Sequence, residues 1–338
     1  MSTAPSTRSV ATLDDVADAA GVHASTVSRA LSRPGMVHAD TLRRVRAAAD
    51  RLGYVPNRAA RQLAGGRTAA VAVIVPDVTN PFFAGIVQAV QRATADEPRL
   101  VLLADTAMSA GTEVDAVASL AGNVDGAVLC SPMAPVGRLR EAARGRPLVL
   151  VNRRARDVSS VEVDQHAIVR LALDHLAALG HRRIGVMLGP TSYWSSSERS
   201  RCLDRLDLGA SVEIVRIGTS RPTFDGGRAC IDAVVDSEVT AVAAFNDVMA
   251  LGLVAAASER GLRVPDDLSV VGSDGVSIGA MSLPALTTVA APVSELGRLA
   301  LRAVDEQLTG GSTSTSSASP DLVVRSSTAA PPARRSRG

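Results

Sequence analysis

From Thr68 onward, the sequence repeats short apolar runs that are separated by longer stretches with apolar residues at helical spacing. Apolar runs of about four to eight residues between helical segments are typical of parallel strands that are buried on both faces. Because the runs fall into two groups, the pattern predicts two doubly wound α/β subdomains. The runs are AAVAVIVPD, LVLLAD, DGAVLCS and PLVLVN in the first group, and RIGVMLG, VEIVRIG, TAVAAFN and LSVVGSD in the second.

Polar side chains follow these runs where each predicted strand ends. Ligands of doubly wound folds bind beyond the carboxyl ends of the strands, so these positions are candidate binding residues. They are Asp77 to Phe83, Asp105, Ser131, Asn152, Arg153, the residues from Gly189 onward, Asn246, Asp247, Ser273 and Asp274.

The candidate positions combine amides, carboxylates, an arginine and aromatic rings, in a chain with only 2% aromatic residues. Such a set suits a sugar or a similar polyhydroxy ligand, held by hydrogen bonds and ring stacking. Two alternatives stay open. Phe82 is better explained as a core residue at the start of a helix. Asp274 and Arg153 are alternatively explained as a structural ion pair with each other.

The first 68 residues differ from the rest of the chain in charge. They hold ten arginines and five aspartates, a balance of +5 in a chain whose formal net charge is +2, so the remaining residues sum to −3. A small basic head on a mildly acidic body is typical of a nucleic-acid-binding module joined to a second domain.

Three short helices are predicted in this head. Thr12 and Asp15 have the spacing of a capping box, and Gly21 has the position of a helix-ending glycine. A second helix begins near Ala24 after a very short turn, which is the signature of a helix-turn-helix, and a third runs from about Asp40 to Leu52. The expected inward residues are Leu13, Val16, Ala17, Ala20, Val27, Ala30, Leu31, Leu42, Val45, Ala49 and Leu52.

The outward face of the second helix is the candidate DNA-reading surface. It carries short side chains and one arginine, Arg29, where a solvated face would usually carry Glu and Lys. Short side chains let a helix enter the major groove, where Ser forms adaptable hydrogen bonds and Arg can bind guanine. The alternative is an ordinary surface helix of a small bundle.

Several other classes of protein are disfavoured. No run of about 18 uncharged apolar residues spans a bilayer, and the first residues lack the apolar stretch of a secretory signal. The three cysteines (Cys130, Cys202 and Cys230) are far apart, which fits reduced thiols better than disulfides or a zinc site. No phosphate-binding loop, HExxH or GxSxG motif is present. We therefore expect a cytoplasmic protein without a membrane segment, metal, cofactor or catalytic site.

The segment TLDDVADAAGVHASTVSRALSRPGMVHADTLRRVRAAADRLGYVPNRAARQL resembles the DNA-binding head of the LacI/GalR family of bacterial repressors. The resemblance implies that Ala24 and Ser25 choose the operator and that Arg29 contacts a base. The segment departs from the family at His23 and His38, where the family usually has Ser or Thr, which are better helix-capping residues. Residues expected to contact phosphates and set the register are Thr12, Thr26, Ser28, Thr41, Tyr54, Asn57 and Ala60.

The same resemblance implies a hinge helix over residues 58–64, which is too short to be stable alone in water. In the family this helix orders on operator DNA, and the leucine matched by Leu63 wedges into the central minor-groove step. The alternative is a simple linker with Leu63 packed against the second domain.

PDVTNPFF, HLAALGHRRIGVMLGP, ERGLRVPDDLSVVGSD and LTTVAAPVSELG resemble the family's effector domain, which is similar to periplasmic sugar-binding proteins. By matched position, the residues expected to line an effector cleft are Phe83, Asn152, Arg199, Asn246 and Asp274. Arg153 joins them because it follows a predicted strand. The pattern departs from the family at Gln165, Cys202 and Gly275, and Trp194 is a candidate replacement for a stacking residue.

These observations predict a helix-turn-helix domain over residues 1–56, a hinge and linker over 57–67, and an effector and dimerisation domain over 68–329. The first lobe is expected at about 68–163 plus 292–310, and the second at about 164–291 plus 311–329. Residues 310–320 are predicted to be a low-complexity linker, and 330–338 a disordered tail. We expect a repressor that binds a pseudo-palindromic DNA operator as a homodimer, because no leucine heptad for a higher oligomer is present.

Overall fold

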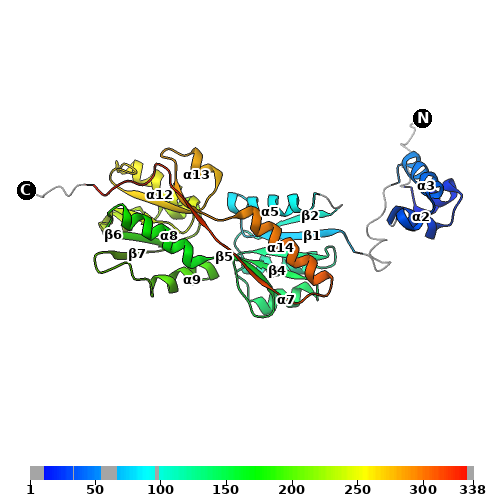
Figure 1. Cartoon of the computed structure of the whole chain (residues 1–338), viewed down its shortest axis with the longest axis horizontal. Coiled ribbons are helices and arrows are strands. Elements are labelled where there is room, and N and C mark those ends of the chain that lie inside the picture. The colour runs from blue at the N-terminus through cyan, green and yellow to red at the C-terminus, as the bar shows by residue number, and fades with distance from the viewer. Residues whose placement is uncertain (1–10, 33, 55–66, 96–98, 333–338) are drawn as a thin grey trace, which may run out of the picture. The chain divides into compact units, whose positions relative to one another are not determined.

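The computed structural model describes residues 11–32, 34–54, 67–95 and 99–332 (Figure 1). The chain divides into two compact units, Met1–Thr68 and Ala69–Gly338. The described residues of the first unit form helices without strands, and the second unit contains two sheets with helices on both faces of each. Within the described residues, no helix has the length and apolar character needed to cross a membrane.

The first unit, which we call the head, forms the predicted three helices. They are α1 (Leu13–Ala20), α2 (Ala24–Ser32) and α3 (Ala39–Leu52), with a 3-10 turn at Pro34–Met36. The capping box is present, because the Thr12 hydroxyl accepts the Asp15 N–H at 3.3 Å while the Asp15 carboxylate accepts the Thr12 N–H at 2.7 Å. The Thr12 hydroxyl also donates to the Asp15 carboxylate at 2.7 Å, and the two hydrogen bonds that this carboxylate accepts from Thr12 lower the pKa of Asp15. Gly21 ends α1 with a φ of 61°, the left-handed conformation that favours glycine.

The head has one small core between its three helices. Most of the expected apolar residues are buried there, and Leu13, Leu31 and Leu42 pack against them half-buried. Leu52 is an exception to the prediction: it is 39% exposed, because it is the last residue of α3. The buried residues are Val16, Ala17, Ala20, Val27, Ala30, Val45, Ala48 and Ala49.

The second unit contains the two predicted doubly wound lobes, each built on a six-stranded sheet. The first sheet has the order β11-β5-β4-β3-β1-β2 and is parallel throughout. Its strands are β1 (Ala70–Val75), β2 (Leu100–Asp105), β3 (Gly126–Cys130), β4 (Leu148–Val151), β5 (Ser159–Val163) and β11 (Thr315–Ala318). Helices α5 (Pro81–Ala93) and α14 (Val293–Leu308) cover one face, and α6 (Ala110–Leu120) and α7 (Val136–Ala143) cover the other.

The second sheet has the order β12-β10-β9-β8-β6-β7, and its pairs are parallel except for the antiparallel pair of β10 and β12. Its strands are β6 (Arg183–Leu188), β7 (Glu213–Thr219), β8 (Ala241–Ala243), β9 (Ser269–Asp274), β10 (Thr287–Ala290) and β12 (Asp321–Val323). Its helices are α8 (Gln165–Ala178), α9 (Trp194–Leu203), α10 (Phe224–Arg228), α11 (Ile231–Asp236), α12 (Asp247–Glu259) and α13 (Ser277–Met281).

Strand β1 illustrates why the apolar runs become parallel strands. Val71, Val73 and Val75 enter the core beneath α5 and α14, whereas the alternate residues Ala72 and Ile74 enter the core on the opposite face. A strand covered on both faces must be apolar at every position, and all six residues of β1 are buried.

The chain passes between the lobes three times, after β5, after β10 and after β11 (Figure 1). The third passage contradicts the predicted linker over residues 310–320. Residues 315–318 were expected in a linker of the second lobe, but they form β11 at the edge of the first sheet, in register with Ser160–Val163. Threonine and serine are compatible with this edge strand, because it pairs with a neighbour on only one side and is largely exposed. The low-complexity composition therefore concealed the strand in the sequence.

Candidate functional site

The exposed face of α2 carries the side chains predicted to contact DNA. Ser25, Ser28 and Arg29 are exposed, whereas Ala24 and Thr26 are half-buried. The Arg29 Nε donates to the Ser25 carbonyl oxygen at 3.2 Å, so these two residues lie one helical turn apart on the same face. Ala24 also packs against the head core, which limits how far it projects.

The residues predicted to hold DNA phosphates lie around this helix in the head. The Thr12 side chain is engaged in the capping box of α1. Thr41 lies half-buried in the first turn of α3, and Tyr54 packs half-buried against the core while its N–H donates to the Ala49 carbonyl at 2.9 Å. The predicted residues Asn57, Ala60 and Leu63 lie outside the described residues.

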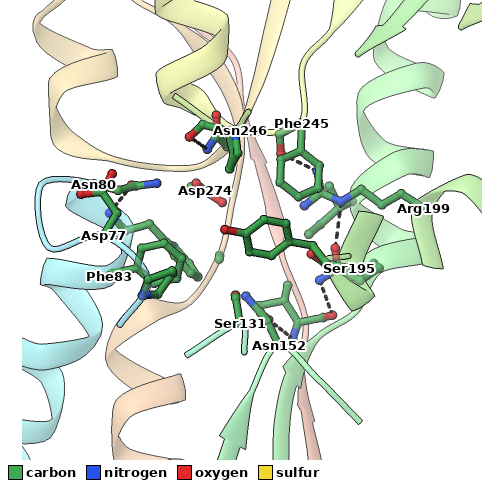
Figure 2. Close-up of a pocket in the computed structure, with 18 of the residues that line it drawn as sticks. Asp77, Asn80, Phe83, Ser131, Asn152, Ser195, Arg199, Phe245, Asn246 and Asp274 are labelled. Atoms are coloured by element: carbon green, nitrogen blue, oxygen red, sulfur yellow. Dashed lines mark hydrogen bonds between the residues drawn. The ribbon is translucent and has the colours of Figure 1, made fainter. Parts of the chain in front are cut away.

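The second unit has a pocket of about 590 Å³, counted with its open mouth, at the carboxyl ends of strands from both lobes (Figure 2). Five of the six predicted effector residues line it: Phe83, Asn152, Arg199, Asn246 and Asp274. Each follows or ends a strand, or lies in the first turns of the following helix, which is the position that the doubly wound fold favours for ligands.

Arg199 is the buried cation of this pocket. Its Nε donates to Gln165 Oε1 at 2.8 Å, and its two terminal nitrogens donate to the Phe245 carbonyl at 2.6 Å and to Ser273 Oγ at 3.3 Å. The guanidinium also lies 4.7 Å from the centre of the Phe245 ring. Burial lowers the pKa of Arg199 to about 10, although nearby Asp274 opposes the change, so the group stays charged near neutral pH.

Asp274 lines the pocket from the second lobe, and the buried Asp247 acts on its charge without lining the pocket. Burial, followed by the charge of Asp247, raises the pKa of Asp274 well above its ordinary value. Asp247 is fully buried and accepts the Val276 N–H at 2.8 Å and the Thr288 hydroxyl at 2.6 Å. Burial raises the pKa of Asp247 as well. Asp247 thus fixes the turn that follows Asp274, and Asp274 faces the pocket.

Four residues of the pocket wall have left-handed backbone conformations. The φ angles are 56° at Met108, 45° at Ser131, 54° at Asn152 and 129° at Asp274. Each such conformation costs on the order of 1–3 kcal/mol outside glycine and is concentrated at ligand sites. Their gathering at one pocket is independent support for a binding function.

The two predicted asparagines also shape the pocket. Asn246 caps α12 by accepting the Met249 N–H at 2.8 Å, and it donates to the Pro222 carbonyl at 3.1 Å. The Asn152 side-chain oxygen accepts the Val163 N–H at 3.3 Å, just before the chain first leaves the first lobe.

The structure does not bring Arg153 to the pocket, so this predicted site residue is wrong. Its terminal nitrogen donates to the carbonyls of Pro132 and Ala134 at 2.7 and 2.8 Å. The buried Glu113 binds the same loop by accepting the Ala134 N–H at 2.8 Å. The alternative ion pair of Arg153 with Asp274 is also wrong, because the cation whose charge acts on Asp274 is Arg199. Arg153 instead stabilises the loop that follows Ser131.

Several pocket residues were not among the predicted site residues. Asp77, Asn80 and Ser131 were marked only as strand-end positions, Tyr193 and Ser195 only within the stretch from Gly189 onward, and Gln165 and Phe245 were not marked as pocket residues. Trp194, which was one candidate for a stacking residue, does not line this pocket, whereas its neighbour Tyr193 does. Burial raises the pKa of Tyr193 to about 12, and the carboxylates of Glu113 and Asp77 in the first lobe contribute. The strand-end rule marked Asn80 and Ser131, but it does not determine which side chain after β6 enters the pocket.

The described part of the chain holds no group of three His, Cys, Asp or Glu side chains placed to bind a metal ion. The three cysteines are free thiols, and Cys130 and Cys202 are buried. Burial raises the pKa of Cys130 to about 12, which keeps that thiol protonated and unreactive.

Comparison with known proteins gives a match in each unit. Residues 12–57 match the family model for bacterial regulatory proteins of the lacI family, and residues 173–328 match that for a periplasmic binding protein-like domain. The HTH-type transcriptional regulator MalR of Streptomyces coelicolor is 36% identical over 96% of this chain and 98% of its own length. The HTH-type transcriptional repressor CytR of Escherichia coli is 33% identical over 95% and 97%.

Solved structures match over the same length. A lac repressor dimer bound to operator and the anti-inducer ONPF is 28% identical with a TM-score of 0.82, over 95% of this chain and 100% of that chain. The complex of the transcriptional regulator CelR with cellobiose is 31% identical with a TM-score of 0.70, over 94% and 99%.

These relatives are transcriptional regulators and not enzymes, in agreement with the prediction from the sequence. The fold, the helix-turn-helix head and the binding-protein-like second unit are shared with them along nearly the whole chain. The chain belongs to the LacI family of bacterial transcriptional regulators.

Proposed function

We propose that this regulator is a repressor that binds a pseudo-palindromic operator as a homodimer, and that a sugar or sugar derivative in the pocket controls its DNA affinity. We place its action in the cytoplasm, where operator DNA is. The observation that carries the proposal is the pocket lined from two lobes, in a chain whose residues 12–57 match a DNA-binding family.

The chemistry of the pocket supports a polyhydroxy ligand. Amide, hydroxyl and carboxyl groups surround it together with Phe83 and Tyr193, whose rings offer flat apolar faces. Sugars combine hydroxyls on their edges with apolar faces of C–H groups, so they match such a lining. Among the structural relatives, CelR was solved with cellobiose.

An exposed apolar surface on the second lobe supports the homodimer. Ile278 and Met281 of α13 are 49% and 77% exposed, and Leu283, which follows them, is 96% exposed. Val324 is 58% exposed on a neighbouring segment, which the Ser326 N–H joins to the Ala285 carbonyl at 3.0 Å. Apolar side chains grouped in this way are typical of a protein interface.

For DNA, we assign Ala24, Ser25 and Arg29 to base contacts and the surrounding polar residues of the head to phosphates. Residues 57–67 are assigned as the hinge, in which Leu63 wedges between base pairs. A ligand that contacts both lobes favours one lobe arrangement, and the hinges of a dimer transmit that arrangement to the two heads. A coupling of roughly 1–3 kcal/mol is typical of such linkage.

The test begins with selection of operators from random duplex DNA by the full-length protein, followed by a thermal-shift screen of mono- and disaccharides. We expect a pseudo-palindromic consensus, and a sugar that both raises the melting temperature and changes operator affinity. Binding without sequence preference would contradict the proposed operator recognition, and a sugar that binds without changing DNA affinity would contradict the proposed control.

A further inference from the structure

His23 lies directly before α2 and contacts the exposed Ser25 in two ways. The Ser25 backbone N–H points at His23 Nδ1, with a nitrogen-to-nitrogen distance of 3.3 Å. The Ser25 hydroxyl oxygen lies 3.0 Å from the same Nδ1. The imidazole is thus both the cap of the recognition helix and the partner of a side chain that we assign to operator choice.

The two contacts together fix the direction of the hydroxyl hydrogen bond. A backbone N–H can only donate, so Nδ1 must be the acceptor and cannot carry a proton. The neutral imidazole therefore has its proton on Nε2, and the Ser25 hydroxyl, 3.0 Å from Nδ1, is the second donor that shares the single Nδ1 lone pair with the Ser25 N–H. With its proton directed at Nδ1, the Ser25 oxygen can only accept a further hydrogen bond, through its lone pairs.

This direction matters because the major groove presents donors and acceptors that differ between bases. Adenine and cytosine present amino groups, which donate, at N6 and N4. Guanine O6 and thymine O4 accept, so they meet the Ser25 oxygen with no shared proton. A freely rotating serine hydroxyl accommodates either kind of base, whereas one committed to Nδ1 accommodates only the first.

We propose that His23 is a positioning residue that makes Ser25 a hydrogen-bond acceptor toward DNA, so that Ser25 selects adenine or cytosine on the strand it contacts. The proposal rests on the proposed assignment of Ser25 to operator choice. A serine hydroxyl alone can donate or accept, so the contact with His23 is what would give Ser25 a base preference.

His38 provides a matched control within the head. It precedes α3 as His23 precedes α2, but its side chain makes no capping hydrogen bond. Its Nδ1 lies 3.9 Å from the Asp40 carboxylate, and both side chains are largely exposed. His23→Ala and His38→Ala each delete an imidazole that precedes a helix. Only His23→Ala removes the partner of a candidate base-contacting residue, Ser25.

The experiment is selection and sequencing of half-sites from a randomised operator library with full-length wild-type protein and four variants: His23→Ala, His23→Asn, Ser25→Ala and His38→Ala. Wild type should favour adenine or cytosine over guanine or thymine at one position by roughly fivefold, as expected for one hydrogen bond. His23→Ala and Ser25→Ala should both reduce that preference to less than about twofold and leave other positions unchanged. His23→Asn, whose side-chain oxygen also accepts, should restore it, and His38→Ala should keep the wild-type profile.

Two results would overturn the inference. If His23→Ala weakens all half-sites equally and the preference survives, His23 only caps the helix or holds a phosphate. If wild type prefers guanine or thymine at the Ser25-dependent position, the hydroxyl donates to DNA and not to Nδ1. A different result, in which Ser25→Ala leaves every base preference intact, would instead refute the assignment of Ser25 to operator choice, and the inference would fail with it.

Discussion

At the scale of single residues, charge and hydrogen-bond direction determine what the two candidate sites can bind. In the head, Arg29 is the exposed cation of α2 and shares a helix face with Ser25. In the pocket, Arg199 is held by three hydrogen bonds and the Phe245 ring, while Asp274 faces the same space. The head residues follow from helical spacing and family resemblance, whereas the partners of Arg199 depend on contacts between distant segments.

Arg29→Ala should weaken binding to the selected operator by roughly 5- to 150-fold, because a bidentate contact of arginine with guanine contributes about 1–3 kcal/mol. Fluorescence anisotropy with labelled operator and with scrambled DNA measures this loss. Arg51→Ala, which removes an exposed arginine from the last turn of α3, is the control and should leave operator preference unchanged. Equal operator affinity for wild type and Arg29→Ala would refute the base contact.

Phe83→Ala and Asp274→Ala should each weaken the binding of the pocket ligand at least tenfold, since one loses an apolar wall and the other a polar partner. Trp194→Ala should change that affinity less than about threefold, because Trp194 does not line the pocket. Isothermal titration of the sugar found in the thermal-shift screen provides the comparison. A larger loss with Trp194→Ala than with Phe83→Ala would restore Trp194 as the stacking residue.

At the scale of elements, close helix packing stabilises the first lobe, and the C-terminal segment stabilises the second. Helix α14 crosses α5 at Gly297, where an added Cβ would lie 2.4 Å from the Ala89 Cβ. The segment after β12 extends along the second lobe, and Ala329 accepts a hydrogen bond from His181 Nε2 at 3.0 Å. The regular apolar runs made most strands predictable, but the polar strands β5, β10 and β11 are recognised only through their partners in the sheet.

Gly297→Ala should lower the free energy of unfolding by about 1–3 kcal/mol, because α5 and α14 must move apart. Gly137→Ala in α7 is the matched control, since an added Cβ there meets no atom within 4 Å. That control should stabilise the protein by up to about 1 kcal/mol, because alanine favours a helix over glycine. Urea unfolding of both variants tests the difference, and equal effects would contradict the packing.

Stability should fall as the pH is lowered from 7 to 5, in part because of His181. Burial lowers the pKa of this imidazole, which is fully buried between Thr240 and Ala329. The unfolded chain then takes up a proton near pH 6.5 while the folded chain resists it, so the folded state loses stability as the pH falls below that value. His181→Gln should flatten the dependence of unfolding free energy on pH, and an unchanged slope would show that other groups cause it.

At the scale of the whole molecule, the sequence was sufficient for the two-unit organisation and the doubly wound lobes, and five of the six predicted effector residues line the pocket. Those features depend on local periodicity, on the strand-end rule and on family resemblance. Arg153 was misplaced because sequence position after a strand does not determine whether a side chain turns into the pocket or back onto its own loop. Tyr193 could not be singled out for the same physical reason, because it was one of several residues after Gly189 and sequence position does not show which of them enters the pocket.

We propose that occupancy of the pocket controls DNA binding. The decisive measurement is the affinity of the full-length protein for its selected operator with and without saturating sugar, in wild type and in Asp274→Ala. We predict a change of roughly 5- to 150-fold in wild type, little change in the variant, and similar operator affinity for both proteins without sugar. A wild-type protein that binds the sugar yet keeps the same operator affinity would contradict the account.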